Sequence, residues 1–284
     1  VGGWFRCGTR ANEGYAEMTV CLYLPGGRVA FMYKRPEIDS NDAFDAGGIR
    51  FDVIEPFKRL DVSYTGRVVM LDDPLQMADP KSAFTNNPYA ECEVRIEYTG
   101  VSDMFGGEPD EPHEKPGEEF AKGHYEQLIA GKGTIRVGDE EWEVDGFGLR
   151  DHSWGPRYWQ ALSYYRWLTC NFGPDFGFMG SEVVRHDGSK TQGGVVVRDG
   201  QLTNVKAINI QTDFDEAGLY HRKFQATLGL DGDEELVVDG AVKSFIPLRN
   251  RREGKVTHIG EGMTEYRCGD HVGYGLSEYL DQVR

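Results

Sequence analysis

Short glycine-containing turns separate runs of β-branched and aromatic residues along much of the chain. Gly26 and Gly27 divide two such runs at 15–24 and 28–35, and Asp-Gly pairs recur at 187–188, 199–200 and 231–232. A two-residue turn of this kind between β-prone runs is a strong signal for a β-hairpin. We therefore expect a chain of antiparallel hairpins. The 37 glycines and 12% aromatic residues support this expectation, because many short strands joined by tight turns need both.

Alternation of apolar and polar residues extends the hairpin pattern over the rest of the chain. It predicts further strands at 49–54, 58–64, 67–71, 91–98, 124–129, 133–137, 141–145, 161–170, 176–184, 193–197, 205–210, 223–228, 235–240, 241–246 and 257–267. Residues 273–280 fit either a closing strand or a short helix. Prolines interrupt 72–90, which is predicted to be irregular. Residues 102–122 are rich in glycine, proline and acid, and they predict a long loop, either a lid or a surface excursion.

The strands together predict an all-β protein. At 284 residues the chain is long enough for two modest domains, each with a core of its own. The fold class we expect is two tandem antiparallel barrels or curved sheets. We place the N-terminal domain at 1–140 and the C-terminal domain at 141–284.

Charge and cysteine content narrow the range of partners. Asp and Glu outnumber Lys and Arg by 47 to 31, and a net charge of −16 argues against nucleic acid or an anionic membrane surface. No apolar run reaches membrane-spanning length, and the first residues show no signal-peptide pattern. The five cysteines are scattered without a C-x-x-C pair, so neither a zinc site nor a disulfide framework is indicated. We expect a cytoplasmic protein.

One run near the middle of the chain, at 146–159, is denser in charged, aromatic and turn-forming residues than any other. Its glycines and proline exclude a helix interior. Within it Asp151 precedes His152, and a carboxylate beside an imidazole can orient the ring and suit it to proton transfer near neutral pH. The same residues also suit a structural corner that satisfies buried polar groups. Spacing alone leaves both interpretations open.

Strand alternation groups further polar side chains. His124 and Glu126 are expected on one face of the strand at 124–129, where inward polar groups cost free energy unless they are paired or used. In the strand at 176–184, Glu182 lines up with Phe176 and Phe178. This arrangement predicts either an aromatic-lined cavity with one inward charge or plain core.

Patterns for metals and nucleotides are weak. The seven histidines show no H-x-H or H-x-x-x-H spacing, so we expect no metal. Gly146 and Gly148 are followed by Asp151 where a third glycine would be needed, and no strand-to-helix unit surrounds them. We therefore expect no cofactor.

The run Arg150-Asp151-His152-Ser153-Trp154-Gly155-Pro156-Arg157, with His124-Tyr125-Glu126-Gln127 upstream and Gly275-Leu276-Ser277-Glu278-Tyr279 downstream, resembles a known superfamily. It is similar to the carotenoid hydratases and AttH-like proteins, a group that also holds decalin-forming cyclases, and in particular to a bacterial branch linked to aromatic or terpenoid catabolism. Asp151, His152, Trp154 and Gly155 match the Asp-His-x-Trp-Gly pattern of that group. The resemblance implies a tandem lipocalin-like (calycin) fold, a hydrophobic ligand cavity, and chemistry by side chains without a redox cofactor.

The function we expect is a cofactor-independent lyase acting on a hydrophobic aromatic or isoprenoid small molecule. The reaction would be a hydration or dehydration, a retro-aldol-type cleavage or a ring opening, because a buried acid–base pair can serve each of these. The candidate catalytic residues are Asp151 and His152, with Glu182, Glu126 or His124 as the second group. The candidate substrate-binding residues, aromatic walls and arginines that could hold a carboxylate or phenolate, are Tyr33, Arg150, Trp154, Arg157, Tyr158, Trp159, Tyr164, Arg166 and Trp167.

Two alternatives to a lyase stay open. The protein could bind a hydrophobic ligand without catalysis, as lipocalins do, with the central run serving as a structural latch. It could also be a cyclase or isomerase on the same fold. An exposed barrel edge or aromatic face could additionally support a homo-oligomer.

Overall fold

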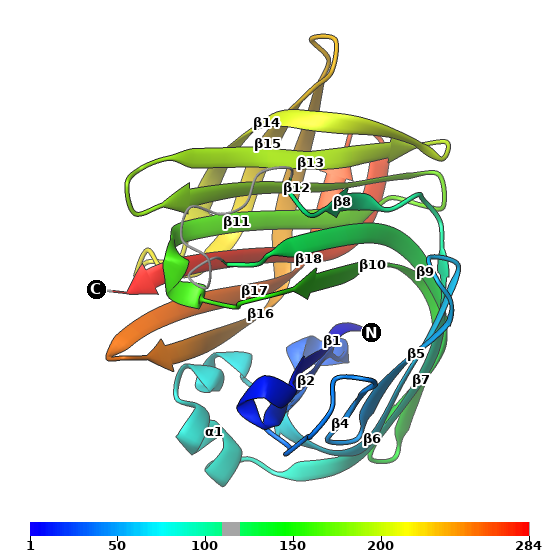
Figure 1. The fold of residues 1–284 in the computed structure, drawn as a ribbon, viewed down its shortest axis with the longest axis vertical. Helices are drawn as coiled ribbons and strands as arrows, with labels where there is room; N and C mark the ends of the chain where they lie inside the picture. The colour runs from blue at the N-terminus through cyan, green and yellow to red at the C-terminus, as the bar shows by residue number, and fades with distance from the viewer. Residues whose placement is uncertain (110–119, 284) are drawn as a thin grey trace. The chain divides into compact units, whose positions relative to one another are not determined.

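The computed structural model describes residues 1–109 and 120–283 (Figure 1). By its internal contacts the chain divides into two compact units. Unit 1 consists of Val1–Gly100 and Ala130–Gly146, and unit 2 of Val101–Ile129 and Phe147–Arg284. The predicted domain boundary between residues 140 and 141 stays a prediction. Residues 110–119 of the predicted loop lie outside the described residues.

Unit 1 contains most of a ten-stranded sheet with the main strand order β1-β2-β3-β6-β7-β9-β10. Off this path, β4 pairs with β5, β5 pairs with β6, and β8 pairs with β9. The strands and the first short helical turns are β1 Gly2–Arg10, η1 Ala11–Glu13, β2 Tyr15–Tyr23, η2 Pro25–Gly27, β3 Val29–Lys34, β4 Phe44–Ala46, β5 Ile49–Glu55, β6 Arg59–Leu71, β7 Tyr89–Gly100, β8 Phe105–Gly107, β9 Gly123–Val137 and β10 Glu140–Trp154. The predicted hairpin at 15–35 is confirmed as β2 paired with β3.

Alternation along β2 builds the core of unit 1. Met18, Val20 and Leu22 are fully buried and pack in one cluster with Ala30 and Met32 of β3. The residues between them point to the other face of the sheet, as the pleat requires. Burying a Val, Leu or Met side chain completely stabilises a fold by roughly 1.5–3 kcal/mol. A one-residue slip of β2 would move this whole set out of the core.

Two breaks that the sequence predicts between strands do not occur, because the glycines there lie inside continuous strands. The strands expected at 58–64 and 67–71 form one strand, β6, and those at 124–129 and 133–137 form one strand, β9. A Cβ at Gly131 would lie 2.6 Å from the Tyr98 ring, and one at Gly133 would overlap the carbonyl oxygen of Arg95. These glycines therefore permit neighbouring strands to approach rather than turn the chain.

The segment at 72–90 was expected to be irregular, and this expectation is wrong. It forms η3 Pro74–Ala78 and the helix α1 Pro80–Asn86, which is cyan in Figure 1. Asp73 accepts a hydrogen bond from the Leu75 backbone and Asp79 from the Ser82 backbone, at 3.0 and 3.3 Å. An Asp cap followed directly by proline starts a helix well. No helix in the described parts of the chain has both the length and the apolar character needed to cross a membrane.

Unit 2 contains a closed barrel of the eight consecutive strands β11 to β18. The elements are η4 Trp159–Ala161, β11 Leu162–Asn171, β12 Phe176–Arg185, β13 Lys190–Arg198, β14 Gln201–Phe214, β15 His221–Leu230, β16 Glu235–Arg252, β17 Lys255–Cys268 and β18 His271–Val283. The expected separate strands at 235–240 and 241–246 are one strand, β16. The end of the chain is a strand, and β18 closes the barrel by pairing with β11, seen as red beside green in Figure 1. The all-β fold of two tandem lipocalin-like domains is confirmed.

Candidate functional site

Three titratable side chains of unit 2 meet where β9 begins and β10 ends. His124 Nε2 lies 3.4 Å from Glu126 Oε1 and 3.5 Å from Asp151 Oδ1. His124 and Glu126 are two residues apart in β9 and so share a face. β10 is the neighbouring strand, and the Lys122 backbone N–H donates to the Trp154 carbonyl at 2.8 Å. Asp151 of β10 lies beside His124 across this strand pair.

Glu126 is the buried member of this group, with only 2% of its surface exposed. Its Oε1 accepts a hydrogen bond from the indole Nε1 of Trp167 at 2.7 Å, while its Oε2 is buried without a hydrogen-bond partner in the described part of the chain. The pKa of Glu126 is raised overall. Burial is the main cause and the charge of Asp151 adds to it, whereas hydrogen bonds from His124 and Trp167 lower the pKa in part. A buried carboxyl oxygen without a hydrogen-bond partner costs free energy and therefore needs an explanation.

His124 is the accessible member of the group. Its side chain is 42% exposed, and that of Asp151 is 47% exposed. Burial lowers the pKa of His124, but hydrogen bonds to the carboxylates of Asp151 and Glu126 outweigh this effect and raise it to about 10. The ring is therefore an imidazolium at neutral pH. A bound molecule could reach both a proton donor and a carboxylate here.

The other face of the same strand pair carries an aromatic group. His152 Nδ1 lies 3.3 Å from the Tyr125 hydroxyl, the His152 and Trp154 rings are 5.6 Å apart, and the Arg150 guanidinium lies 5.5 Å from the centre of the Tyr125 ring. Burial lowers the pKa of His152, and the charge of Arg150 lowers it further. Asp151 and His152 are adjacent in a strand and so point to opposite faces. The sequence suggested that Asp151 would orient His152, but it lies beside His124 instead.

Close packing under the site depends on two glycines. A Cβ at Gly123 would overlap the indole ring of Trp154, and Gly106 has a φ of +103°, a conformation that other residues rarely adopt. The Trp154 indole in turn donates to Glu108 Oε1 at 2.8 Å, and Lys122 Nζ lies 3.5 Å from the same oxygen. Glu108 and Lys122 were not foreseen, because both fall in the segment that reads as a featureless loop.

Glu182 lies elsewhere in unit 2. Its carboxylate accepts hydrogen bonds from Tyr164 at 3.0 Å, Lys190 at 2.8 Å and Gln192 at 2.6 Å. Burial raises the pKa of Glu182, but these three donors outweigh it and the pKa is lowered overall. Glu182 is thus held as a satisfied carboxylate among its own strand neighbours.

The predicted substrate-binding residues are dispersed. Trp167 and Trp154 belong to the two faces described above, and Arg150 lies beside Tyr125. Arg166 donates two hydrogen bonds to the Asp281 carboxylate, at 2.8 and 3.1 Å. Its guanidinium also lies 4.7 Å from the centre of the Tyr164 ring and 4.4 Å from that of Tyr279. A separate aromatic group is formed by Arg157 and Trp159 around Phe120, and the Arg252 guanidinium lies over the Tyr158 ring. Tyr33 belongs to unit 1, where its hydroxyl donates to Glu17.

The same three groups could also hold a cation. One ligand atom each from His124, Glu126 and Asp151 lies within 4.8 Å of the others. The sequence-based expectation of no metal considered histidine pairs, and a set with one histidine and two acids from neighbouring strands falls outside those patterns. In the structure these three groups pair with one another, since the His124 imidazole lies within 3.5 Å of both the Glu126 and the Asp151 carboxyl groups.

The fold defines the class of the chain as a protein with two tandem lipocalin-like domains, and solved structures share this fold. A crystal structure from Nitrosomonas europaea, provisionally named AttH, matches with a TM-score of 0.53 and 12% identity, covering 95% of this chain and 88% of that one. CghA (TM-score 0.48, 13% identity, 99% and 86% covered) and kievitone hydratase from Nectria haematococca (0.49, 12%, 99% and 89%) are also similar. The fold that the sequence resemblance implied is therefore confirmed.

A family model described as "Domain of unknown function (DUF7064)" matches residues 1–283 of this chain. The chain belongs to this family. No curated protein matches its sequence.

Proposed function

We propose that the protein is a cofactor-independent lyase of the hydratase or dehydratase type, acting on a hydrophobic aromatic or isoprenoid molecule. The observation that carries this proposal is the arrangement of His124, whose half-exposed imidazole has its Nε2 between buried Glu126 and exposed Asp151. Adding or removing water requires a proton donor and a proton acceptor on one small region of substrate. Here the two lie 3.5 Å apart.

The catalytic residues in this scheme are His124 and Asp151. In the dehydration direction, the Asp151 carboxylate takes a proton from a substrate carbon while the His124 imidazolium gives a proton to the departing hydroxyl group, which leaves as water. The proton then passes from Asp151 to His124, and the site is restored. Hydration is the same sequence in reverse, so one site serves both directions.

Glu126 is a positioning residue, because it acts through His124. Its buried carboxylate holds the imidazole ring and favours the protonated form, and the Trp167 indole holds that carboxylate in turn. Aromatic side chains close by suit a hydrophobic substrate. The Asp-His-x-Trp-Gly resemblance to the carotenoid hydratase group supports the same class of reaction.

The test is turnover by metal-stripped protein of a panel of prenylated phenols and isoprenoids, followed by mass spectrometry. We expect a mass change of one water in the wild type and its loss in His124→Gln and Asp151→Asn. Glu265→Gln is the matched control, because Glu265 is an acid of unit 2 that pairs with Lys243 and Arg267 instead.

A further variant separates the two histidines. His152→Gln should retain far more activity than His124→Gln, since His152 lies on the opposite face of the strand pair with Tyr125. Full activity in folded His124→Gln would refute the site. Tight binding of panel members without product, unchanged in all variants, would instead indicate a ligand-binding protein.

A further inference from the structure

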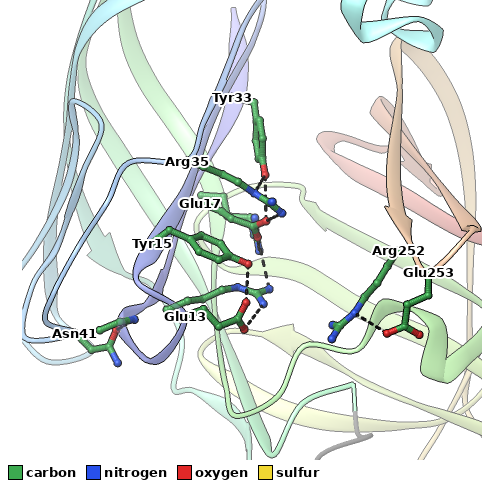
Figure 2. A network of polar contacts seen from close by, with 11 residues as sticks. Glu13, Tyr15, Glu17, Tyr33, Arg35, Asn41, Arg252 and Glu253 are labelled. Carbon is green, nitrogen blue, oxygen red and sulfur yellow. Dashed lines mark hydrogen bonds and ion pairs between the residues drawn. The ribbon is translucent and has the colours of Figure 1, made fainter.

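Unit 1 holds an unusual group of arginines around one buried carboxylate. Glu17 is 5% exposed, and three guanidinium groups approach it: Arg35 at 2.8 Å, Arg6 at 3.1 Å and Arg10 at 3.5 Å. The Tyr33 hydroxyl also donates to Glu17 Oε1 at 3.0 Å. Figure 2 shows Tyr33 and Arg35 directed at this carboxylate.

Strand register explains why these side chains meet. Arg6 of β1 and Tyr33 of β3 are both paired with Thr19 of β2, so the three lie in a row across the sheet. Directly paired residues of antiparallel strands share a face, and Glu17 is two residues from Thr19 on that same face. The group is therefore built into regular strands rather than into a loop.

The charges do not balance within this group. One buried carboxylate needs one counter-ion, yet three arginines contact Glu17, and the only further carboxylate they pair with among the described residues is that of Glu13, from Arg10. The guanidinium groups outnumber the carboxylates by one charge, in a chain whose net charge is −16. A partly buried group with one more positive than negative charge is costly, although each arginine has a carboxylate neighbour. A bound anion would remove that cost.

The guanidinium groups are also held in place before any ligand binds. Arg35 Nε donates to the Tyr33 hydroxyl at 2.8 Å, and the Arg35 guanidinium lies 4.9 Å from the centre of the Tyr15 ring. Asn41 accepts from the Ala11 backbone at 2.9 Å, which anchors the turn after Arg10. Arg6 and Arg35 are 33% and 53% exposed, so a ligand can reach them. Fixed arginines with spare N–H donors suit the oxygens of a carboxylate or phosphate.

A second, independent feature points to a ligand on this face. Trp4 is two residues before Arg6 in β1 and so shares its face, and its indole Nε1 is buried without a hydrogen-bond partner in the described part of the chain. We infer that unit 1 carries a binding site for the oxyanion, a carboxylate or a phosphate, of an otherwise apolar ligand that packs against Trp4. This inference does not depend on the acid–base site of unit 2.

The experiment is calorimetric titration of the full chain with benzoate, phenyl phosphate and the uncharged benzyl alcohol. We expect benzoate or phenyl phosphate to bind at least about 10-fold more tightly than the alcohol, and the better of the two identifies the anion. Arg6→Gln and Arg35→Gln should each weaken that binding by about 10-fold. Arg28→Gln, which removes an arginine of unit 1 that pairs with Glu140, should leave it unchanged.

Folding of each variant is checked by circular dichroism. If Arg35→Gln fails to fold, Arg35→Lys keeps the ion pair with Glu17 but not the planar fork, and it should still weaken binding several-fold. The inference is overturned if neither anion binds the wild type more tightly than the alcohol. It is equally overturned if the folded arginine variants bind like the wild type, because the group is then only a structural charge network.

Discussion

Protonation of His221 is expected to control the acid stability of the barrel. This residue of β15 is completely buried, its ring is stacked on that of Tyr279 at 3.9 Å, and its Nε2 lies 2.8 Å from the Ser277 hydroxyl. Its Nδ1 is buried without a hydrogen-bond partner in the described part of the chain. Burial lowers the pKa of His221 to about 3, so the folded barrel holds it neutral.

The size of the effect follows from the difference between the folded and unfolded states. The unfolded chain takes up a proton on this histidine near its ordinary pKa of 6.5, whereas the folded chain does so only near 3. Below pH 6.5 the unfolded state therefore binds more protons, and the free energy of unfolding falls by about 1.4 kcal/mol for each pH unit. Between pH 7.5 and 4.5 the loss due to His221 is about 3 kcal/mol, and most of it occurs below pH 6.5.

The assay is urea unfolding of the wild type and His221→Gln at pH 7.5, 6.5, 5.5 and 4.5. Gln is neutral throughout and can still bond to Ser277, so any packing cost is the same at every pH. We expect the stability advantage of the wild type to shrink, or its deficit to grow, by about 3 kcal/mol on going down to pH 4.5. A difference between the two proteins that stays constant with pH would refute the reasoning, and exposed His271→Gln serves as the control.

Three further changes test the packing and charge described above. Glu17→Gln should lower the free energy of unfolding by about 2 kcal/mol at neutral pH, which is less than the full pKa shift implies because solvent screens the exposed arginines. This loss should vanish as the pH falls from 4.5 towards 2, because the wild-type carboxylate is then itself protonated. An equal loss at pH 3 and pH 7 in urea unfolding would contradict this. Trp167→Phe removes the donor to Glu126 and should cost about 1–3 kcal/mol in the same assay, and a loss below measurement error would contradict the hydrogen bond. Gly123→Ala should lower the melting temperature because its Cβ would overlap Trp154, whereas Gly146→Ala, with open space around its Cα, should not; equal effects would contradict the packing.

Hairpins were predictable from the sequence because their signals are local. The Gly26-Gly27 turn and the Asp-Gly pairs act over a few residues, and β2 and β3 appear where alternation indicates them. The break predicted at Gly131 and Gly133 is wrong because the role of these glycines is not local. Their role depends on Arg95 and Tyr98 in a neighbouring strand, and no local pattern distinguishes a glycine that turns the chain from one that lets another strand approach.

The candidate site was partly predictable for the same physical reason. Strand alternation predicts His124 and Glu126 on one face, and in the structure His124 Nε2 lies 3.4 Å from Glu126 Oε1. Asp151 joins them through pairing between strands, and Trp167 reaches Glu126 across 41 positions of sequence. Such pairings depend on long-range topology, so adjacency in the chain favoured His152 as the partner of Asp151.

Most directly, the central proposal is tested by turnover of the substrate panel in ¹⁸O-labelled water with metal-stripped protein. We predict that the wild type either adds ¹⁸O from water at a substrate carbon or removes one water from a hydroxylated panel member, and that His124→Gln loses this activity by at least about 100-fold while remaining folded. Turnover by His124→Gln at the wild-type rate would contradict the proposal, as would panel members that bind to the wild type and neither gain labelled water nor lose water.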